Sequence, residues 1–208
     1  MALLRPSQVL AVWICSAGLL CLTQSPANEF RWDWRNVEED GWEIIGQSKT
    51  LSATTRAGLI QTLASSVHVK SERGLHKIAA QTRVKAVDLS GKGAGEILAQ
   101  AAGTHSGCSP TGNCESWVLQ HNGGTYSVIL HRGAAQTFTI QPTVTNGFHD
   151  IVLGMHGSAF VQELTLYRFD GSKYEFVACY NAKWATRQID GTYHNFEEPE
   201  ITSCPPNK

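Results

Sequence analysis

The sequence predicts a mainly β (α+β) fold: two blade-like antiparallel β units packed as a sandwich or as an open blade pair, with one N-terminal helix. Three observations predict it. Residues 83–180 contain many short segments rich in β-branched and aromatic residues. Gly, Asn and Asp separate these segments, as is typical of tight turns. Two stretches of this region also resemble each other, which predicts duplicated β units.

The first 27 residues are predicted to be a cleaved signal peptide rather than part of the fold. A basic start containing Arg5 is followed by an apolar run over 9–22, which is shorter than the roughly 20 residues that span a bilayer. Small residues at Ser25 and Ala27 suit cleavage after Ala27. We therefore expect a secreted or periplasmic chain, residues 28–208, that forms a single β-rich domain with no membrane span.

The charge balance excludes some classes of partner. The chain has 17 Lys and Arg against 18 Asp and Glu, a net charge of −1, and only Arg5 of these lies in the predicted signal. Such a balance lacks the basic surface that nucleic-acid-binding proteins need. Hydrophobic residues make up 42% of the chain, which is too much for a disordered protein. The sequence therefore predicts a folded protein with no nucleic-acid partner.

Residues 28–82 are predicted to form an N-terminal arm and one helix. Three aromatic residues of the arm alternate with charged residues, so they suit an extended strand packed on the domain or, alternatively, a strip that stacks on sugars. These are Phe30, Trp32 and Trp34. Apolar residues at helical spacing predict the helix over 51–67, with Ser52 as its N-cap. A second, shorter helix over 72–80 is left open.

Eight strands are predicted between residues 83 and 180. They cover residues 84–88, 96–101, 116–120, 126–130, 136–140, 150–153, 163–169 and 174–179. Residues 121–125 and 169–173 contain Asn-Gly and Asp-Gly, which supply the positive φ angles of tight hairpin turns. Residues 181–208 contain three prolines, and we expect them to form a less regular tail on the surface.

Four cysteines remain after removal of the signal. They are Cys108, Cys114, Cys179 and Cys204. Four cysteines allow three pairings. A turn-forming Pro and Gly stand between the first two, which favours a local disulfide and leaves the other two to tie the tail to the body. A four-thiolate zinc site is the alternative, but it normally has paired cysteines with two to four residues between them, so we favour disulfides in an oxidising compartment.

The β region contains an internal repeat. Residues 95–98 match 149–152, and residues 117–126 match 165–174. A period of about 50 residues in β-rich sequence is typical of blade-like units. Residues 87–98, Val-Asp-Leu-Ser-Gly-Lys-Gly-Ala-Gly-Glu-Ile-Leu, and the hairpin after them resemble the FG-GAP/VCBS-like β-repeat. The wider run resembles uncharacterised secreted bacterial proteins, and that resemblance implies no activity.

The resemblance implies propeller blades and a loop that holds Ca²⁺. Asp88, Ser90 and Glu96 would be the ligands here. Lys92 places an ammonium group inside this loop, which opposes a divalent cation, so we favour a structural turn and expect no cofactor. A closed propeller needs at least about four blades. Because two fit into this chain, the two units must bury their faces against each other or against the helix.

These features predict an exported, non-enzymatic binding or interaction protein whose partner is a protein or glycan of the cell envelope or extracellular space. No phosphate loop, dinucleotide fingerprint or nucleophile elbow is present. The loop over 108–114 and the turn over 155–160 are equivalent linkers of the repeat, so we expect them to be neighbours. The candidate binding surface consists of Ser109, Thr111, Asn113, Met155, His156, Ser158 and Phe160.

A small exported hydrolase is the alternative, using Glu96, Asp150 or His156. The two acids are related by the repeat and could form a carboxylate pair, although such acids more often close equivalent turns. His156 and Ser158 lie two residues apart in a predicted glycine-containing turn, a poor spacing for a mutual hydrogen bond. Convergence of the two acids and the histidine in one pocket would favour the enzyme, and their dispersal would favour the binding protein.

Overall fold

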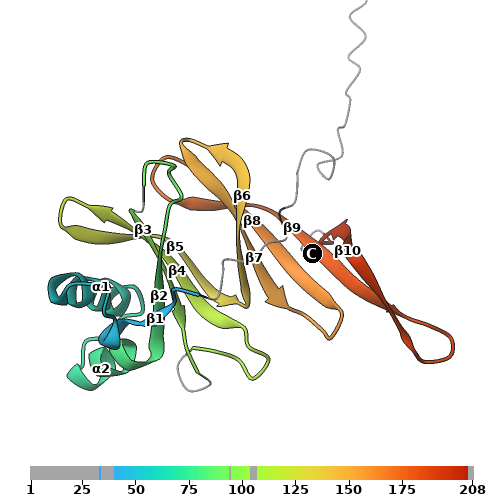
Figure 1. The fold of residues 1–208 in the computed structure, drawn as a ribbon, viewed down its shortest axis with the longest axis horizontal. Helices are drawn as coiled ribbons and strands as arrows, with labels where there is room; N and C mark the ends of the chain where they lie inside the picture. The colour runs from blue at the N-terminus through green and yellow to red at the C-terminus, as the bar shows by residue number, and fades with distance from the viewer. Residues whose placement is uncertain (1–32, 34–39, 94, 104–106, 206–208) are drawn as a thin grey trace, which may run out of the picture.

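The computed structural model describes residues 33, 40–93, 95–103 and 107–205, and it is mainly β with two helices (Figure 1). Two five-stranded antiparallel sheets form the body, as the predicted fold class requires. The predicted signal peptide and the arm residues Phe30, Trp32 and Trp34 lie outside the described residues. Within the described part, no helix is long and apolar enough to cross a membrane.

The first sheet follows the chain order, with each strand beside the next. Its strands are β1 (Glu43–Ile44), β2 (Thr82–Val87), β3 (Glu96–Ala101), β4 (Cys114–Asn122) and β5 (Thr125–Ala135). β3 is the central strand, and all six of its residues are buried. Successive side chains of a strand point to opposite faces, so those of β3 enter two apolar environments. Leu98 packs toward the second sheet, whereas Ile97 and Ala99 pack toward the helices.

Two helices cover the outer face of the first sheet. They are α1 (Ala53–Ser66) and α2 (Glu72–Gln81), and the short 3-10 helix η2 (Ile45–Gln47) precedes them. Ser52 caps α1 as predicted, accepting a hydrogen bond from Thr55 N at 3.0 Å. α2 forms over the segment that the sequence left open as a second, shorter helix. A ten-residue helix is marginal by itself, and contacts such as Ile78 against the sheet stabilise it.

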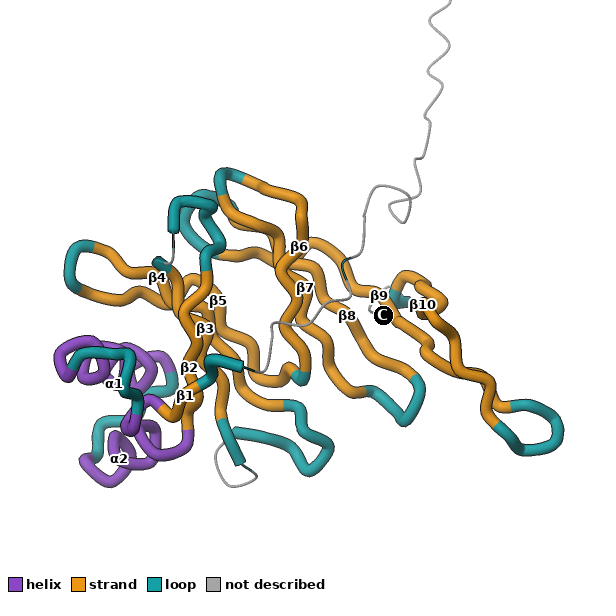
Figure 2. Tube along the Cα trace, in the orientation of Figure 1, coloured by secondary structure: helices purple, strands orange, loops and turns teal. Residues whose placement is uncertain are grey.

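The second sheet has the order β10-β9-β8-β7-β6 and curls like half a barrel (Figure 2). Its strands are β6 (Thr137–Thr145), β7 (Phe148–His156), β8 (Val161–Phe169), β9 (Tyr174–Arg187) and β10 (Tyr193–Ser203). The prediction of an irregular tail is wrong, since residues 181–203 extend β9 and form β10. Pro199 is accommodated where the β9–β10 register shifts between Asn195 and Glu200, so the missing N–H interrupts no regular ladder.

The two sheets bury their inner faces against each other. This core takes residues from β2 to β5 and from β6 to β9. Its members are Val87, Leu89, Leu98, Val118, Ile129, Leu130, Ala135, Phe138, Ile151, Leu153, Tyr167, Phe169 and Tyr174. Each fully buried large apolar side chain contributes roughly 1.5–3 kcal/mol relative to exposure. The sandwich is therefore the main stabilising contact between the sheets.

The strands over 82–135 and those over 137–187 run in the same up-and-down order. Gly123 and Gly171 occupy the matching turns, β4–β5 and β8–β9, with φ of 57° and 111°. Both turns lie where Asn-Gly and Asp-Gly predict them. The origin of this correspondence in a duplication remains a prediction.

Both predicted disulfides form. Because they engage all four cysteines, the alternative of a four-thiolate zinc site is wrong. Cys108 pairs with Cys114, and Cys179 pairs with Cys204. The second bond joins β9 to the residue that follows β10, and Cys204 N also donates to Cys179 O at 2.9 Å. Disulfides of this kind indicate an oxidising environment rather than the cytoplasm.

Removal of the Cys179–Cys204 bond by C179A/C204A should lower the free energy of unfolding by about 3.5 kcal/mol, because the bond closes a loop of 25 residues. The matched variant C108A/C114A opens a loop of only six residues, so it should cost about 2 kcal/mol. Urea unfolding of both variants measures the difference. An equal or reversed order would contradict the loop-length argument, and two alkylatable thiols in the untreated protein would contradict the bonds themselves.

Candidate functional site

The loop over 108–114 and the end of β7 are neighbours, as the sequence predicts. The Asn113 side chain joins them: its Oδ1 accepts from His156 N at 2.7 Å, and its Nδ2 donates to His156 O at 3.1 Å. Asn113 is buried, and this pair of bonds connects the first sheet to the second. Asn113 is therefore a structural clamp within the predicted surface and is not free to bind a partner.

The hydroxyl groups of the predicted surface are also engaged locally. Ser109 Oγ lies 2.8 Å from Thr111 Oγ1 and accepts from Asn113 N at 3.2 Å. Ser158 Oγ accepts from Val161 N at 3.1 Å and so closes the β7–β8 turn. These contacts suit tight loops, and they give Ser158 no base that could activate it.

The aromatic residue of this surface contacts a different hairpin. The ring of Phe160 stacks on Tyr193 of β10, with centroids 4.3 Å apart. Met155 and His156 belong to β7 rather than to the glycine-containing turn expected from the sequence, so that expectation is wrong. Gly154 is needed within this strand because a Cβ there would collide with the side chains of Thr137 and Gln162, which hydrogen-bond to each other at 2.9 Å.

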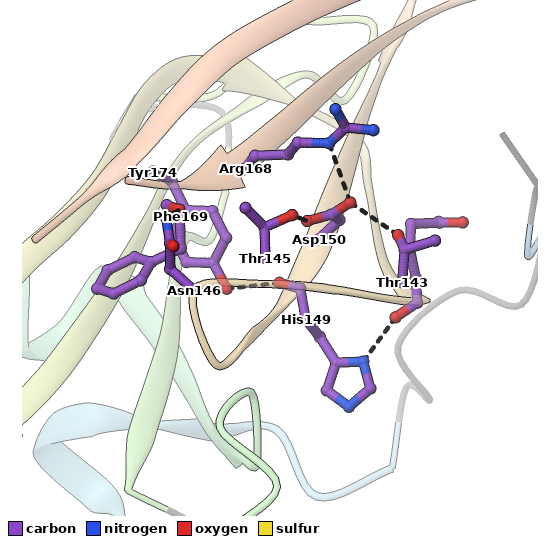
Figure 3. Close-up of polar contacts among 9 residues, drawn as sticks. Thr143, Thr145, Asn146, His149, Asp150, Arg168, Phe169 and Tyr174 are labelled. Carbon is purple, nitrogen blue, oxygen red and sulfur yellow. Dashed lines mark hydrogen bonds and ion pairs between the residues drawn. The ribbon is translucent and has the colours of Figure 1, made fainter. Parts of the chain in front are cut away.

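Asp150 is the centre of a buried polar network at the other end of β7 (Figure 3). Only 1% of this residue is exposed. Its carboxylate accepts from the hydroxyls of Thr143 and Thr145, both at 2.7 Å, and from Arg168 Nε at 3.2 Å. The first two partners belong to β6, so the network ties the β6–β7 hairpin together and pairs the charge with Arg168 of β8.

Glu96 closes the equivalent connection of the first sheet. Its carboxylate accepts from Leu89 N at 3.0 Å, and the residue is 3% exposed. Asp88, in contrast, is exposed and accepts from Gly93 N at 3.0 Å and from Ser90 Oγ at 3.5 Å. Glu96 and Asp88 thus accept from groups within the loop itself, and Ser90 donates to Asp88, an arrangement that suits a structural turn.

A chain of hydrogen bonds links the two acidic positions across the sheets. Leu89 O accepts from His149 N at 2.7 Å, and His149 O accepts from the Tyr174 hydroxyl at 2.7 Å. Burial raises the pKa of Tyr174 well above its usual value, and the carboxylates of Glu96 and Asp150 raise it further. Both acids thus lie near the same neutral phenol, which donates to a backbone carbonyl.

The three residues named for a hydrolase do not converge. Asp150 and His156 are six residues apart on one strand, which corresponds to about 20 Å. Glu96 and Asp150 both lie near Tyr174, but each is buried and engaged in closing a loop or hairpin. The geometry therefore supports no shared catalytic pocket for the three side chains.

A groove that the sequence did not reveal lies between β5 and the second sheet; we call it the edge groove. It consists of a cleft of about 620 Å³ and an adjoining hollow of about 400 Å³, and Arg132 and Phe176 line both. The remaining residues of the cleft are Glu163, Thr165, Cys179, Asn181, Cys204 and Pro205. The hollow is bordered by 128–131, Tyr167 and 173–175.

Two strand edges border this groove. Five successive residues of β5, 128–132, line it, although neighbouring side chains of a strand point to opposite faces. The groove therefore runs along the edge of the strand. β5 is the last strand of its sheet, and β10 pairs with β9 only from Tyr180 onward. Within the described residues, the outer edge of β5 and that of residues 174–178 have no partner strand.

The side chains of the edge groove are mixed in character. Arg132 and Glu163 bring opposite charges, Asn181 brings an amide, and Phe176 is 60% exposed. Alternation along β9 would place Phe176 in the core with Tyr174, and this is why sequence reasoning missed it. Phe176 keeps regular register with Tyr174 and lies opposite Tyr167, yet its ring stays exposed beside the groove.

One cluster in the groove has the composition of a metal site but not the chemistry. Glu163, Cys179 and Cys204 bring their ligand atoms within 4.8 Å of one another. Both sulfurs are joined in the disulfide, so they are not thiolates that could bind a metal ion. The cluster is better described as a carboxylate beside a disulfide.

Comparison with known proteins identifies no relative: no family model, no curated protein and no solved structure matches the chain. The resemblance to FG-GAP/VCBS-like repeats therefore remains a prediction.

Substitution of Asp150 by Ala should lower the free energy of unfolding by about 2–3 kcal/mol, because two hydroxyls and a guanidinium lose their buried acceptor. Chemical denaturation measures the loss. Asp190→Ala removes an exposed turn acid and should have a smaller effect. A D150A protein as stable as the parent would show that the network is not stabilising.

Tyr174 should make the fold sensitive to alkali. Its pKa is raised in the folded state, so its contribution is complete below about pH 10, where an unfolded tyrosine titrates, and is lost as the pH rises further. The free energy of unfolding, measured from pH 8 to pH 11, should therefore fall less steeply above pH 10 in Tyr174→Phe than in the parent protein. Tyr193→Phe, at a half-exposed site, serves as the control with a parent-like slope. Equal slopes in all three proteins would rule out this role.

Proposed function

We propose that the protein is an exported, non-enzymatic binding protein that holds an extended polypeptide segment of an envelope or extracellular partner in the edge groove. The observation that carries this proposal is the pair of strand edges that border one groove without a partner strand among the described residues. An exposed edge is a ready template for another strand, and addition of a peptide strand to such an edge is a recurrent mode of recognition.

The shape of the groove supports an extended ligand. The hollow and the cleft are continuous through Arg132 and Phe176, so a strand that pairs with β5 can continue over the face formed by β8 and β9. There Thr165 pairs with Cys179 and Glu163 with Asn181, which places their side chains on the same face. Backbone pairing would supply affinity, and these side chains would select the sequence.

The side chains favour a peptide with one apolar anchor and polar flanks. Phe176 presents an aromatic ring to solvent beside the groove, and aromatic residues are enriched among the energetically important positions of interfaces. Arg132 and Glu163 each suit a partner charge of opposite sign. The disulfide and Pro205 make one wall rigid, which lowers the entropy lost on binding.

Export is supported by the two disulfides and the predicted signal peptide. An oxidising compartment keeps the Cys179–Cys204 bond intact, and this bond borders the groove. The binding function therefore belongs to the same compartment as the bond that shapes the site.

A phage-displayed library of ten-residue peptides, selected on the oxidised protein, tests the proposal. Enriched sequences should bind with affinity that falls at least tenfold in Phe176→Asp, because the substitution places a charge at the apolar anchor of the groove. Ile189→Asp is the matched control, since Ile189 is fully exposed in the β9–β10 turn outside the groove. Isothermal calorimetry with one synthetic peptide gives both affinities.

Hydrogen–deuterium exchange then distinguishes strand pairing from other binding. The bound peptide should protect amides in 128–132, while amides of β10 keep their exchange rates. A glycan array on the same protein covers the other class of partner. Failure to enrich any peptide, equal binding by F176D and the parent, or binding confined to glycans would each overturn the proposal.

A further inference from the structure

A second hollow lies on the opposite side of the first sheet, beneath helix α2; we call it the α2 pocket. Its volume is about 180 Å³. It is lined by Val67, Lys77, Ile78, Gln81, Thr82, Ala101, Gly107, Glu115 and Trp117. The apolar members come from the end of α1, from α2 and from the sheet, so the pocket lies where the helices cross the strands.

Two residues that line this pocket each carry a buried side-chain polar atom without a hydrogen-bond partner. Trp117 is 5% exposed, and its Nε1 is buried with no acceptor. Gln81 Oε1, at the end of α2, is buried with no donor. These are the two buried side-chain polar atoms without a partner in the described part of the chain, and both residues line the same hollow. Leaving such a group unpaired costs about 1–3 kcal/mol, which a suitable ligand would recover.

The Trp117 ring is held firmly in place. It stacks on His131 with centroids 5.2 Å apart and an angle of 7° between the planes. His131 Nε2 lies 2.8 Å from Glu115 Oε1, so the stacked ring is fixed in turn by a residue that also lines the pocket. The direction of the indole N–H is therefore set before any ligand arrives.

We propose that the α2 pocket binds a small neutral ring compound carrying a hydroxyl or primary amide. The indole N–H can only donate and the Gln81 carbonyl oxygen can only accept, so the ligand must provide an acceptor and a donor together. Hydroxyl and primary amide groups have both. One engineered apolar cavity of about 150 Å³ binds benzene, so a hollow of this size accommodates one substituted ring.

The charges around the pocket agree with a neutral ligand. Lys77 and Glu115 are its charged lining residues, one of each sign. A carboxylate ligand would lack the donor that Gln81 needs and would lie in the same pocket as Glu115. This proposal is independent of the edge groove, because Trp117 packs with the helices on the outer face of the first sheet.

Four probes separate the contributions to binding: benzamide and phenol, which have the required group, toluene, which has the ring alone, and benzoate, which has the charge. The readout is the indole ¹H–¹⁵N signal of Trp117, assigned by its loss in Trp117→Phe. Benzamide and phenol should shift this signal, whereas benzoate should leave it in place. Toluene should bind more weakly than either of the first two by roughly fivefold, the worth of one or two hydrogen bonds.

The variants test the two hydrogen-bonding groups separately. Trp117→Phe keeps a ring in the wall, and it should weaken benzamide roughly fivefold and leave toluene within twofold, as monitored by ligand-observed NMR. Gln81→Met removes the acceptor and should also weaken benzamide binding roughly fivefold while leaving toluene binding within twofold. Trp184→Phe, in β9, is the control and should change neither affinity. An equal loss of affinity for benzamide and for toluene would mean that the substitution had disturbed packing alone, and it would overturn the proposal. The proposal would also be overturned if the Trp117 signal stayed unshifted at millimolar concentrations of benzamide and phenol and showed magnetisation transfer from water. That result would show that the pocket holds water only.

Discussion

Burial of the inner faces of the two sheets against each other is the constraint on which the rest of the structure depends. The apolar inner face of each sheet is covered by the other sheet. Leu98 and Val118 of the first sheet therefore share one core with Ile151 and Leu153 of the second. The contact fixes where β5 ends up relative to β8 and β9. The edge groove exists because two sheets that each finish in an unpaired edge are held together by this core.

Polar contacts determine how the sheets are aligned rather than how strongly they associate. Asn113 grips the backbone of His156 at one end of β7, and Leu89 O accepts from His149 at the other. If either sheet slid past the other, buried polar groups would be left unpaired. The free-energy penalty of an unpaired buried group is larger than the net stabilisation from the hydrogen bond it had made. The same reasoning explains the burial of Asp150 and Glu96, which close connections instead of meeting a substrate.

Much of the secondary structure follows from short stretches of sequence. The turns at Gly123 and Gly171 and the cap at Ser52 depend on residues only a few positions away, and they were predicted correctly. The element left open, α2, and the missed strand, β10, are the ones whose stability comes from distant contacts. α2 is held by the sheet beneath it, and β10, which contains polar residues and a register shift, pairs with an extension of β9.

The sequence by itself determined the β content, the tight turns and the near-neutral net charge, and it favoured both disulfide pairs. Each of these depends on composition or on a few neighbouring residues, and the second disulfide follows from the first by elimination. Only the tertiary structure decided which polar residues are engaged and which remain available. Arg132 and Glu163 line one groove, and Gln81 and Trp117 line one pocket, because packing brings together residues that no local pattern relates.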